Sequence, residues 1–194
     1  ETDGSTEVDE SGTTDTFTIV LDAEPTSNVV IAISSDDTAE AAVSGTITFT
    51  PANWDTPQTV TVTGVDENII DGDQTSTITI TVIDEISDND FSGVVDQTVS
   101  ATTTDDDTAG FTITETDGST EVDESGTTDT FTVVLDAEPT SDVVLTITSD
   151  DTGEATVTST LTFTSANWDT PQTVTVAGVD ENIIDGNQTS TITI

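Results

Sequence analysis

Apolar and polar residues alternate along most of the chain with a period of two. Residues 75–82 show this most clearly, because Thr occupies every second position from 75 to 81 and Ile or Val follows from 78 onward. This is the period of a half-buried β-strand with one packed face and one wet face. Similar runs lie at residues 15–21, 28–34, 42–50, 58–65 and 97–104. No stretch has the period of an amphipathic helix, so we predict an all-β chain.

The sequence also repeats itself with an offset of 114 residues. Residues 1–80 and 115–194 align without gaps, and 67 of the 80 aligned positions are identical. A period of this length suits one immunoglobulin-like sandwich and is too long for a solenoid repeat. We therefore predict tandem immunoglobulin-like β-sandwiches in an elongated array, with a first repeat at 1–107 and a second at 108–194.

The ends of the chain do not coincide with the ends of the repeat. Residues 111–114 predict an opening strand for the second repeat, and its counterpart before Glu1 is missing. The second repeat stops at the counterpart of Ile80, so its C-terminal strands are missing. Because an incomplete sandwich exposes a sheet edge, we expect a window on a longer array whose neighbours are further copies of the repeat.

The charge and composition of the chain exclude several classes of function. The 194 residues include 40 acidic side chains and no Lys, Arg or His, which gives a formal charge of −40. A chain without cationic side chains is not expected to bind nucleic acid or to dock on anionic membranes, and no run is apolar enough for membrane insertion. The absence of Cys and His excludes zinc, haem and iron–sulfur ligation by those side chains, and their nucleophilic chemistry. Carboxylate oxygens remain, and these suit Ca²⁺.

Many of the acidic residues are predicted to converge. Successive loops of an antiparallel sandwich alternate between its two ends, so loops 7–13, 35–40 and 66–74 share one end with the exit at 105–107. This end holds 13 of the 24 acidic residues in the first repeat: Glu7, Asp9, Glu10, Asp36, Asp37, Glu40, Asp66, Glu67, Asp71, Asp73, Asp105, Asp106 and Asp107. Like charges so placed repel by about 1 kcal/mol per pair, and only bound cations can offset this repulsion here. We predict calcium sites at this end.

Four acidic motifs give a family resemblance. They are Val8–Gly12, the pair Asp36-Asp37, the segment Val65–Asp73 and the closing triad Asp105–Asp107. In this combination the repeat resembles the Calx-beta repeat, especially the version found in tandem in large bacterial surface and secreted proteins. The resemblance covers the whole repeat and implies calcium bound by these loops.

The candidate ligands follow from the resemblance and the acidic cluster together. The resemblance implies Glu10, Asp36, Asp66, Asp71, Asp105, Asp106 and Asp107, and the cluster adds Asp37, Glu67 and Asp73. The matching residues of the second repeat are Glu124, Asp150, Asp151, Asp180, Glu181 and Asp185. Asn187 replaces the counterpart of Asp73, and the closing triad of the second repeat lies outside the chain. We therefore expect the second site to be incomplete.

These observations favour a structural function. Near-identical tandem copies provide length, so we expect a non-catalytic repeat of an extracellular bacterial adhesin or surface fibre, made rigid by Ca²⁺ at the junctions between repeats. One alternative is a building block of a self-assembling extracellular matrix filament, and another is a carbohydrate-binding module that stacks sugars on Trp54 and Trp168. A Trp at a strand corner more often closes the core. A last alternative is the solvated acidic surface of a halophilic protein, which would bind cations without specific sites.

Overall fold

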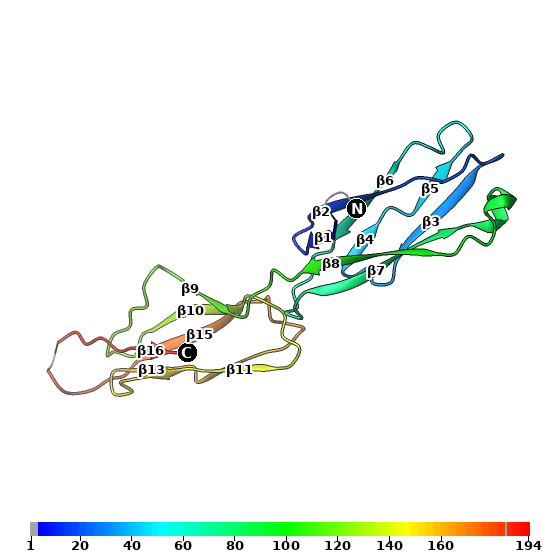
Figure 1. The fold of residues 1–194 in the computed structure, drawn as a ribbon. Helices are drawn as coiled ribbons and strands as arrows, with labels where there is room; N and C mark the ends of the chain where they lie inside the picture. The colour runs from blue at the N-terminus through cyan, green and yellow to red at the C-terminus, as the bar shows by residue number, and fades with distance from the viewer. Residues whose placement is uncertain (1–3, 185) are drawn as a thin grey trace. The chain divides into compact units, whose positions relative to one another are not determined.

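A computed structural model describes residues 4–184 and 186–194 of the chain. The fold is all-β and of the immunoglobulin-like sandwich type, as the alternating pattern predicts (Figure 1). The chain divides into two compact units. Unit 1 comprises residues 1–67 and 71–106, and unit 2 comprises residues 68–70 and 107–194.

Unit 1 is built from two sheets. Its described strands are β1 (Thr6–Asp9), β2 (Thr14–Ile19), β3 (Val29–Ser35), β4 (Ala41–Val43), β5 (Thr46–Phe49), β6 (Gln58–Gly64), β7 (Gln74–Val82) and β8 (Gln97–Thr104). One sheet has the order β1-β8-β7-β3-β5, and the other has the order β2-β6-β4. Two 3₁₀ turns, η1 (Asp84–Ile86) and η2 (Asn89–Phe91), lie between β7 and β8. Strand β1 runs parallel to β8 and forms one edge of the larger sheet.

The core of unit 1 consists of the apolar positions of the alternating strands. Phe49, Val60, Ile78 and Ala101 are fully buried, and Phe17 is nearly so. Burial of these β-branched and aromatic side chains is the main favourable contribution to folding, at about 25 cal/mol for each Å² of apolar surface removed from water. Most Thr side chains between them lie on the partly or fully exposed faces.

The predicted strand at 42–50 is in fact two strands that belong to different sheets. Strand β4 pairs with β6, whereas β5 pairs with β3. The change of sheet happens between Ser44, whose N–H donates to Thr61, and Gly45, whose carbonyl accepts from Ile33. The alternation of apolar residues continues across this point, so periodicity alone does not reveal the break.

Unit 2 repeats the same chain path in its first part. Its described strands are β9 (Phe111–Glu115), β10 (Thr128–Leu135), β11 (Val143–Thr146), β12 (Thr148–Ser149), β13 (Ala155–Val157), β14 (Thr160–Phe163), β15 (Gln172–Gly178) and β16 (Ile192–Thr193). They form one sheet in the order β13-β15-β10-β9 and two pairs, β11-β14 and β12-β16. The predicted opening strand at 111–114 is confirmed, because β9 pairs antiparallel with β10.

Unit 2 has its own core around Phe131, Val133, Phe163 and Val174. Trp168 packs against this core, in agreement with the expectation that the tryptophan closes a strand corner. Trp54, its counterpart in unit 1, is half-buried. Within the described residues, no helix has the length and apolar character needed to cross a membrane.

Candidate metal centre

The most unusual side chain in unit 1 is that of Glu10. It follows β1 directly, and its side chain is 0 % exposed. Its backbone N–H donates to the carbonyl of Thr104 at 3.2 Å, which fixes the residue beside the end of β8. Neither carboxylate oxygen has a hydrogen-bond partner among the described residues. A buried carboxylate without a partner is costly, so this side chain requires a proton or a cation.

The path of the chain around Glu10 is tightly constrained. Gly64 lies against the backbone of Asp9, and a Cβ at position 64 would collide with the Asp9 carbonyl oxygen. The N–H of Gly64 donates to the carbonyl of Thr13 at 3.0 Å. The end of β6 therefore holds the turn that carries Glu10 against the core.

Glu40 is the second buried carboxylate of this end. Its side chain is 6 % exposed, and its Oε2 has no hydrogen-bond partner among the described residues. Its backbone carbonyl accepts from the N–H of Val65 at 2.9 Å and from the hydroxyl of Thr103 at 3.3 Å. The segment after β6 and the end of β8 thus hold Glu40 in place just before β4.

Four carboxylates come together at this point. One oxygen from each residue lies within 4.8 Å of the others in the set Glu10, Glu40, Glu67 and Asp71. Oxygens on opposite sides of a Ca²⁺ ion, each about 2.3–2.6 Å from it, are separated by about 5 Å. The four oxygens can therefore share one ion. Two of the residues are buried, Glu67 is half-buried and Asp71 is exposed, so the set opens to solvent on one side.

The electrostatics of the set favour a bound cation. Burial is the main cause that raises the pKa of Glu10 to about 7, and the negative charges of Asp105, Glu40, Glu67 and Asp71 contribute to the same rise. Burial also raises the pKa of Glu40, with Asp71 and Glu67 as the next causes. Both shifts mean that the ionised forms are unfavourable where they stand, because no cationic side chain exists in the chain to compensate them. A bound divalent cation would favour the ionised forms of both carboxylates.

Asp105 extends the site. One of its carboxylate oxygens lies within 4.8 Å of one of Glu10. Its Oδ2 accepts from the N–H of Gly72 at 2.8 Å, and its backbone N–H donates to Asp73 at 3.4 Å. Asp106 is exposed and ends unit 1, whereas Asp107 belongs to unit 2.

The remaining predicted ligands of unit 1 are exposed and do not join this set. Asp36 accepts from the N–H of Thr77 at 2.7 Å, and Asp37 accepts from the N–H of Ala39 at 3.0 Å. The Asp36 carboxylate therefore ties the end of β3 to β7, and the Asp37 carboxylate stabilises the turn before β4. Asp66 and Asp73 are also exposed. The structure thus brings together Glu10, Glu67, Asp71 and Asp105 from the predicted residues.

The ligand prediction leaves out Glu40. The residue belongs to the acidic cluster that loop alternation places at this end, but none of the four family motifs contains it. The feature of the sequence that could have indicated Glu40 is its position between the polar turn 36–39 and the strand that begins with Ala41. An acidic residue at the first inward position of a strand is rarely found without a partner or a ligand.

The predicted ligands of unit 2 do not form a comparable set. Among its described residues, no three acidic side chains come close enough to share an ion. Glu124 is exposed, as are Asp150, Asp151 and Asp180, and Glu181 is half-buried. The predicted ligand Asp185 lies outside the described residues. The described residues of unit 2 therefore give no second candidate centre.

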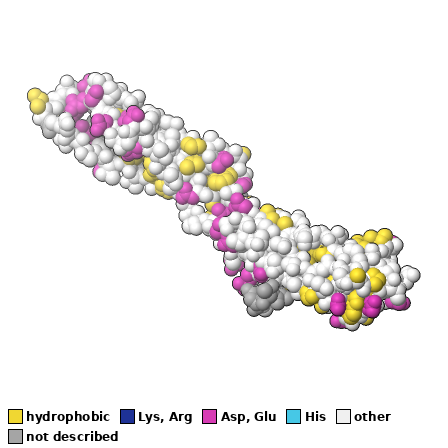
Figure 2. Space-filling view, turned by 90° about the horizontal axis from the view of Figure 1, so that it is seen from above, with side chains coloured by type: hydrophobic (Ala, Val, Ile, Leu, Met, Phe, Trp, Pro, Cys, Tyr) yellow, Lys and Arg dark blue, Asp and Glu magenta, His cyan; other side chains and the backbone are white. Residues whose placement is uncertain are grey.

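Figure 2 shows how acidic side chains recur over the face in view, with no Lys, Arg or His among them. Most of these carboxylates are exposed and solvated. Glu10 and Glu40 differ because they are buried. Buried carboxylate oxygens without hydrogen-bond partners among the described residues, rather than acidic composition, therefore distinguish the candidate centre.

Comparison with known proteins gives a likeness of fold. No protein-family model matches the chain, and no curated protein matches it in sequence. The calcium-binding domain CBD12 of CALX1.1 is similar over 93 % of this chain and 75 % of that one, with 16 % identity and a TM-score of 0.40. Domains 5–6 of the S-layer protein SbsC match over 91 % and 80 %, with 21 % identity and a TM-score of 0.34.

A GH5 xyloglucanase from Bacteroides ovatus matches over 52 % of this chain and only 17 % of the enzyme, with 21 % identity and a TM-score of 0.34. Calx-beta domains are thus among the structures of similar fold. TM-scores of 0.40 and below assign neither a ligand nor an activity to this chain.

Proposed function

We propose that the chain is a non-catalytic structural repeat that binds Ca²⁺ through the carboxylates of Glu10, Glu40, Glu67 and Asp71. The observation that carries this proposal is Glu10, a fully buried carboxylate whose two oxygens have no hydrogen-bond partner among the described residues. A cation at this position would be coordinated by the Glu10 carboxylate and would compensate its buried negative charge.

The choice of ion follows from the donor set. All candidate donors are carboxylate oxygens, and they come from three separate loops rather than from one rigid element. Ca²⁺ accepts six to eight oxygens with variable geometry, so carbonyl groups and water can complete its shell. Mg²⁺ requires a stricter octahedron and keeps its own water, which suits convergent loops less well.

Non-specific cation binding, as on the acidic surface of a halophilic protein, does not account for the buried carboxylates. Such a surface keeps its carboxylates in water, where hydrated cations screen them at long range. Glu10 and Glu40 are instead packed into the end of the sandwich. A site with buried donors favours a dehydrated or partly dehydrated ion that binds at a fixed position.

We propose that the chain belongs to an extracellular array of repeats, in which calcium stiffens successive units. The 114-residue repetition supports the array, and Asp105, one residue before the end of unit 1, supports the link between the ion and the end of the unit. In millimolar calcium, an ion bound with a Kd of about 10⁻⁴ M would stabilise the folded unit by about 1.4 kcal/mol.

Calorimetric titration with CaCl₂ tests the binding site directly. The chain should bind at least one calcium ion more tightly than millimolar, and the Glu10→Gln variant should lose that ion. Glu124→Gln is the matched control, because Glu124 is the repeat counterpart of Glu10 and its side chain is exposed. Equal calcium binding by the wild type and the Glu10→Gln variant would contradict the proposed site.

A further inference from the structure

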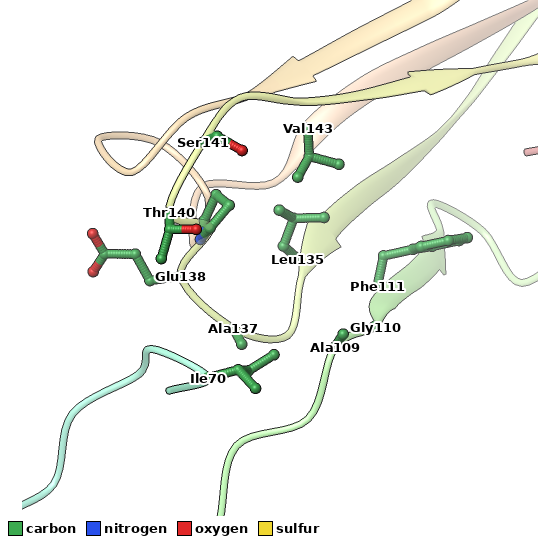
Figure 3. Close-up of a pocket in the computed structure, with 11 residues that line it drawn as sticks. Ile70, Ala109, Gly110, Phe111, Leu135, Ala137, Glu138, Thr140, Ser141 and Val143 are labelled. Carbon is green, nitrogen blue, oxygen red and sulfur yellow. The ribbon is translucent and has the colours of Figure 1, made fainter. Parts of the chain in front are cut away.

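Unit 2 has a pocket of about 430 Å³ that is mostly apolar. Figure 3 shows Ile70, Leu135, Ala137 and Val143 among the residues that line it. Within the part of the chain that the structure describes, none of these lining residues has a buried side-chain oxygen or nitrogen without a hydrogen-bond partner. No buried polar group at this pocket therefore requires a ligand. Buried hydroxyl groups without partners occur instead in unit 1.

Thr6 and Ser76 carry these hydroxyl groups. Their side chains are 2 % and 1 % exposed. Neither Oγ1 of Thr6 nor Oγ of Ser76 has a hydrogen-bond partner among the described residues. A hydroxyl that leaves water without gaining a new hydrogen bond is unfavourable. Both groups therefore need a partner that the described protein atoms do not supply.

The two hydroxyls lie on either side of one alanine. Strand β8 runs between β1 and β7 in the larger sheet. Ala101 of β8 pairs with Thr6 of β1 and with Ser76 of β7. Residues paired in this way on adjacent strands point to the same face of a sheet. All three are buried, so this face is the interior of the sandwich.

Ala101 leaves room between the two hydroxyls. Neighbouring strands are about 4.8 Å apart, so the backbones of Thr6 and Ser76 are separated by about 10 Å. The single methyl group of Ala101 fills less of this span than the larger side chains of Val99 and Thr103 fill beside it on β8. One water molecule with two hydrogen bonds joins oxygens that are about 5.5 Å apart. Two hydroxyls that project over Ala101 from opposite sides can reach this separation.

Thr103 shows how the protein satisfies a buried hydroxyl in the next row of the same sheet. Its side chain is 0 % exposed, and its hydroxyl donates to the carbonyl of Glu40 at 3.3 Å. Thr6 and Ser76 have no comparable partner among the described residues. Their row of the sheet is therefore the place in unit 1 where a small polar molecule would satisfy two buried groups at once.

We propose that unit 1 binds one water molecule in its interior, between Oγ1 of Thr6 and Oγ of Ser76 and over the methyl group of Ala101. Water can donate to one hydroxyl and accept from the other. Buried waters bond to groups that have no other partner, and they form part of the folded structure. This water would connect β1 to β7 across β8, in addition to the backbone hydrogen bonds of the sheet. The proposal does not depend on the calcium function.

Substitutions that remove one hydroxyl at a time test the site. Thr6→Val keeps the shape of the side chain, and Ser76→Ala removes the opposite hydroxyl. Each variant should lower the melting temperature of unit 1 by a few degrees, because the water loses a partner. The double variant should lower it by clearly less than the sum, because both hydroxyls bind the same water. Thr120→Val, at the repeat counterpart of Thr6, is the matched control and should leave the unit 1 transition unchanged.

Nuclear magnetic resonance tests for the water itself. Water-selective nuclear Overhauser spectra of the labelled wild type should show a long-lived water beside the Thr6 methyl group and the Ser76 Cβ protons. The double variant should lack these signals. A Thr6→Val variant that melts at or above the wild-type temperature would overturn the proposal, because removal of an unpartnered buried hydroxyl is favourable. Strictly additive losses, or a wild type without the water signals, would overturn it as well.

Discussion

Glu10 shows how a single residue can link folding to a ligand. Its carboxylate is buried, and the nearest charged groups that raise its pKa are other carboxylates. In the absence of a cation, the ionised side chain costs folding free energy. Glu10→Gln removes the charge and keeps the shape, so in EDTA at pH 8 we expect the variant to melt several degrees above the wild type.

In calcium, we expect the wild type to melt above the Glu10→Gln variant. In CaCl₂ the wild type gains stability from the bound ion, whereas the Glu10→Gln variant gains much less. Differential scanning calorimetry of both proteins in both buffers measures the four melting temperatures. Glu124→Gln should behave like the wild type throughout. A Glu10→Gln variant that is less stable in EDTA would show that the carboxylate is satisfied without an ion.

The raised pKa of Glu10 also predicts how stability depends on pH. The folded chain holds the Glu10 proton more tightly than the unfolded chain, because the folded pKa is about 7 against an ordinary value of 4.5. This contribution is complete below about pH 4.5 and is lost as the pH rises through about 7. The pKa of Glu40 is raised too, so Glu40 acts in the same direction.

The corresponding measurement is the melting temperature in EDTA between pH 4.5 and 8. We expect it to fall across this range, and to fall less in the Glu10→Gln variant. The difference between the two curves separates Glu10 from the general repulsion of a chain with formal charge −40. Parallel curves would mean that Glu10 titrates normally.

At the scale of the element, Asp88 fastens the segment between β7 and β8 to the start of β3. Its side chain is 4 % exposed, and its Oδ2 accepts from Thr26 and Ser27. The N–H of Asp90 donates to its Oδ1 at 3.0 Å. Hydrogen bonds from Asp90, Thr26 and Ser27 lower the pKa of Asp88 to about 2.

The Asp88→Asn variant should therefore destabilise unit 1 by about 2 kcal/mol at neutral pH, the usual scale for hydrogen bonds to a buried charge. Because the folded pKa is lowered, this stabilisation is present above about pH 3.8 and is lost as the pH falls toward 2. Denaturant unfolding measures the difference. Asp90→Asn is the control, since its side chain is exposed. Equal stability of the two variants would contradict this role of Asp88.

The sequence predicts the strands of unit 1 well because their alternation reflects burial directly. Strands β6, β7 and β8 lie within one residue of the predicted limits. The change of sheet between Ser44 and Gly45 could not be predicted, since it depends on which neighbour each half-strand pairs with. Glu40 is a further example, because Val65 and Thr103, which hold its backbone carbonyl, lie in distant segments.

At the scale of the whole molecule, the burial of Glu10 depends on strands that are distant from it in sequence. Residues 1–18 and 115–132 are identical, yet Glu10 is buried and Glu124 is exposed. In unit 1, β8 pairs in parallel with β1, and the carbonyl of Thr104 at the end of β8 accepts from the N–H of Glu10. The candidate centre thus depends on a completed sheet as much as on its carboxylates.

The most direct test of the calcium function is the melting of the chain in four solutions: EDTA, about 5 mM CaCl₂, about 5 mM MgCl₂ and molar KCl. We predict a large rise in melting temperature with CaCl₂, a smaller one with MgCl₂, and only the modest rise that charge screening gives in KCl. The rise should belong to the transition that the Glu10→Gln variant alters. Equal stabilisation by KCl and CaCl₂ would contradict a specific site, and would leave an acidic scaffold whose charge needs only to be screened.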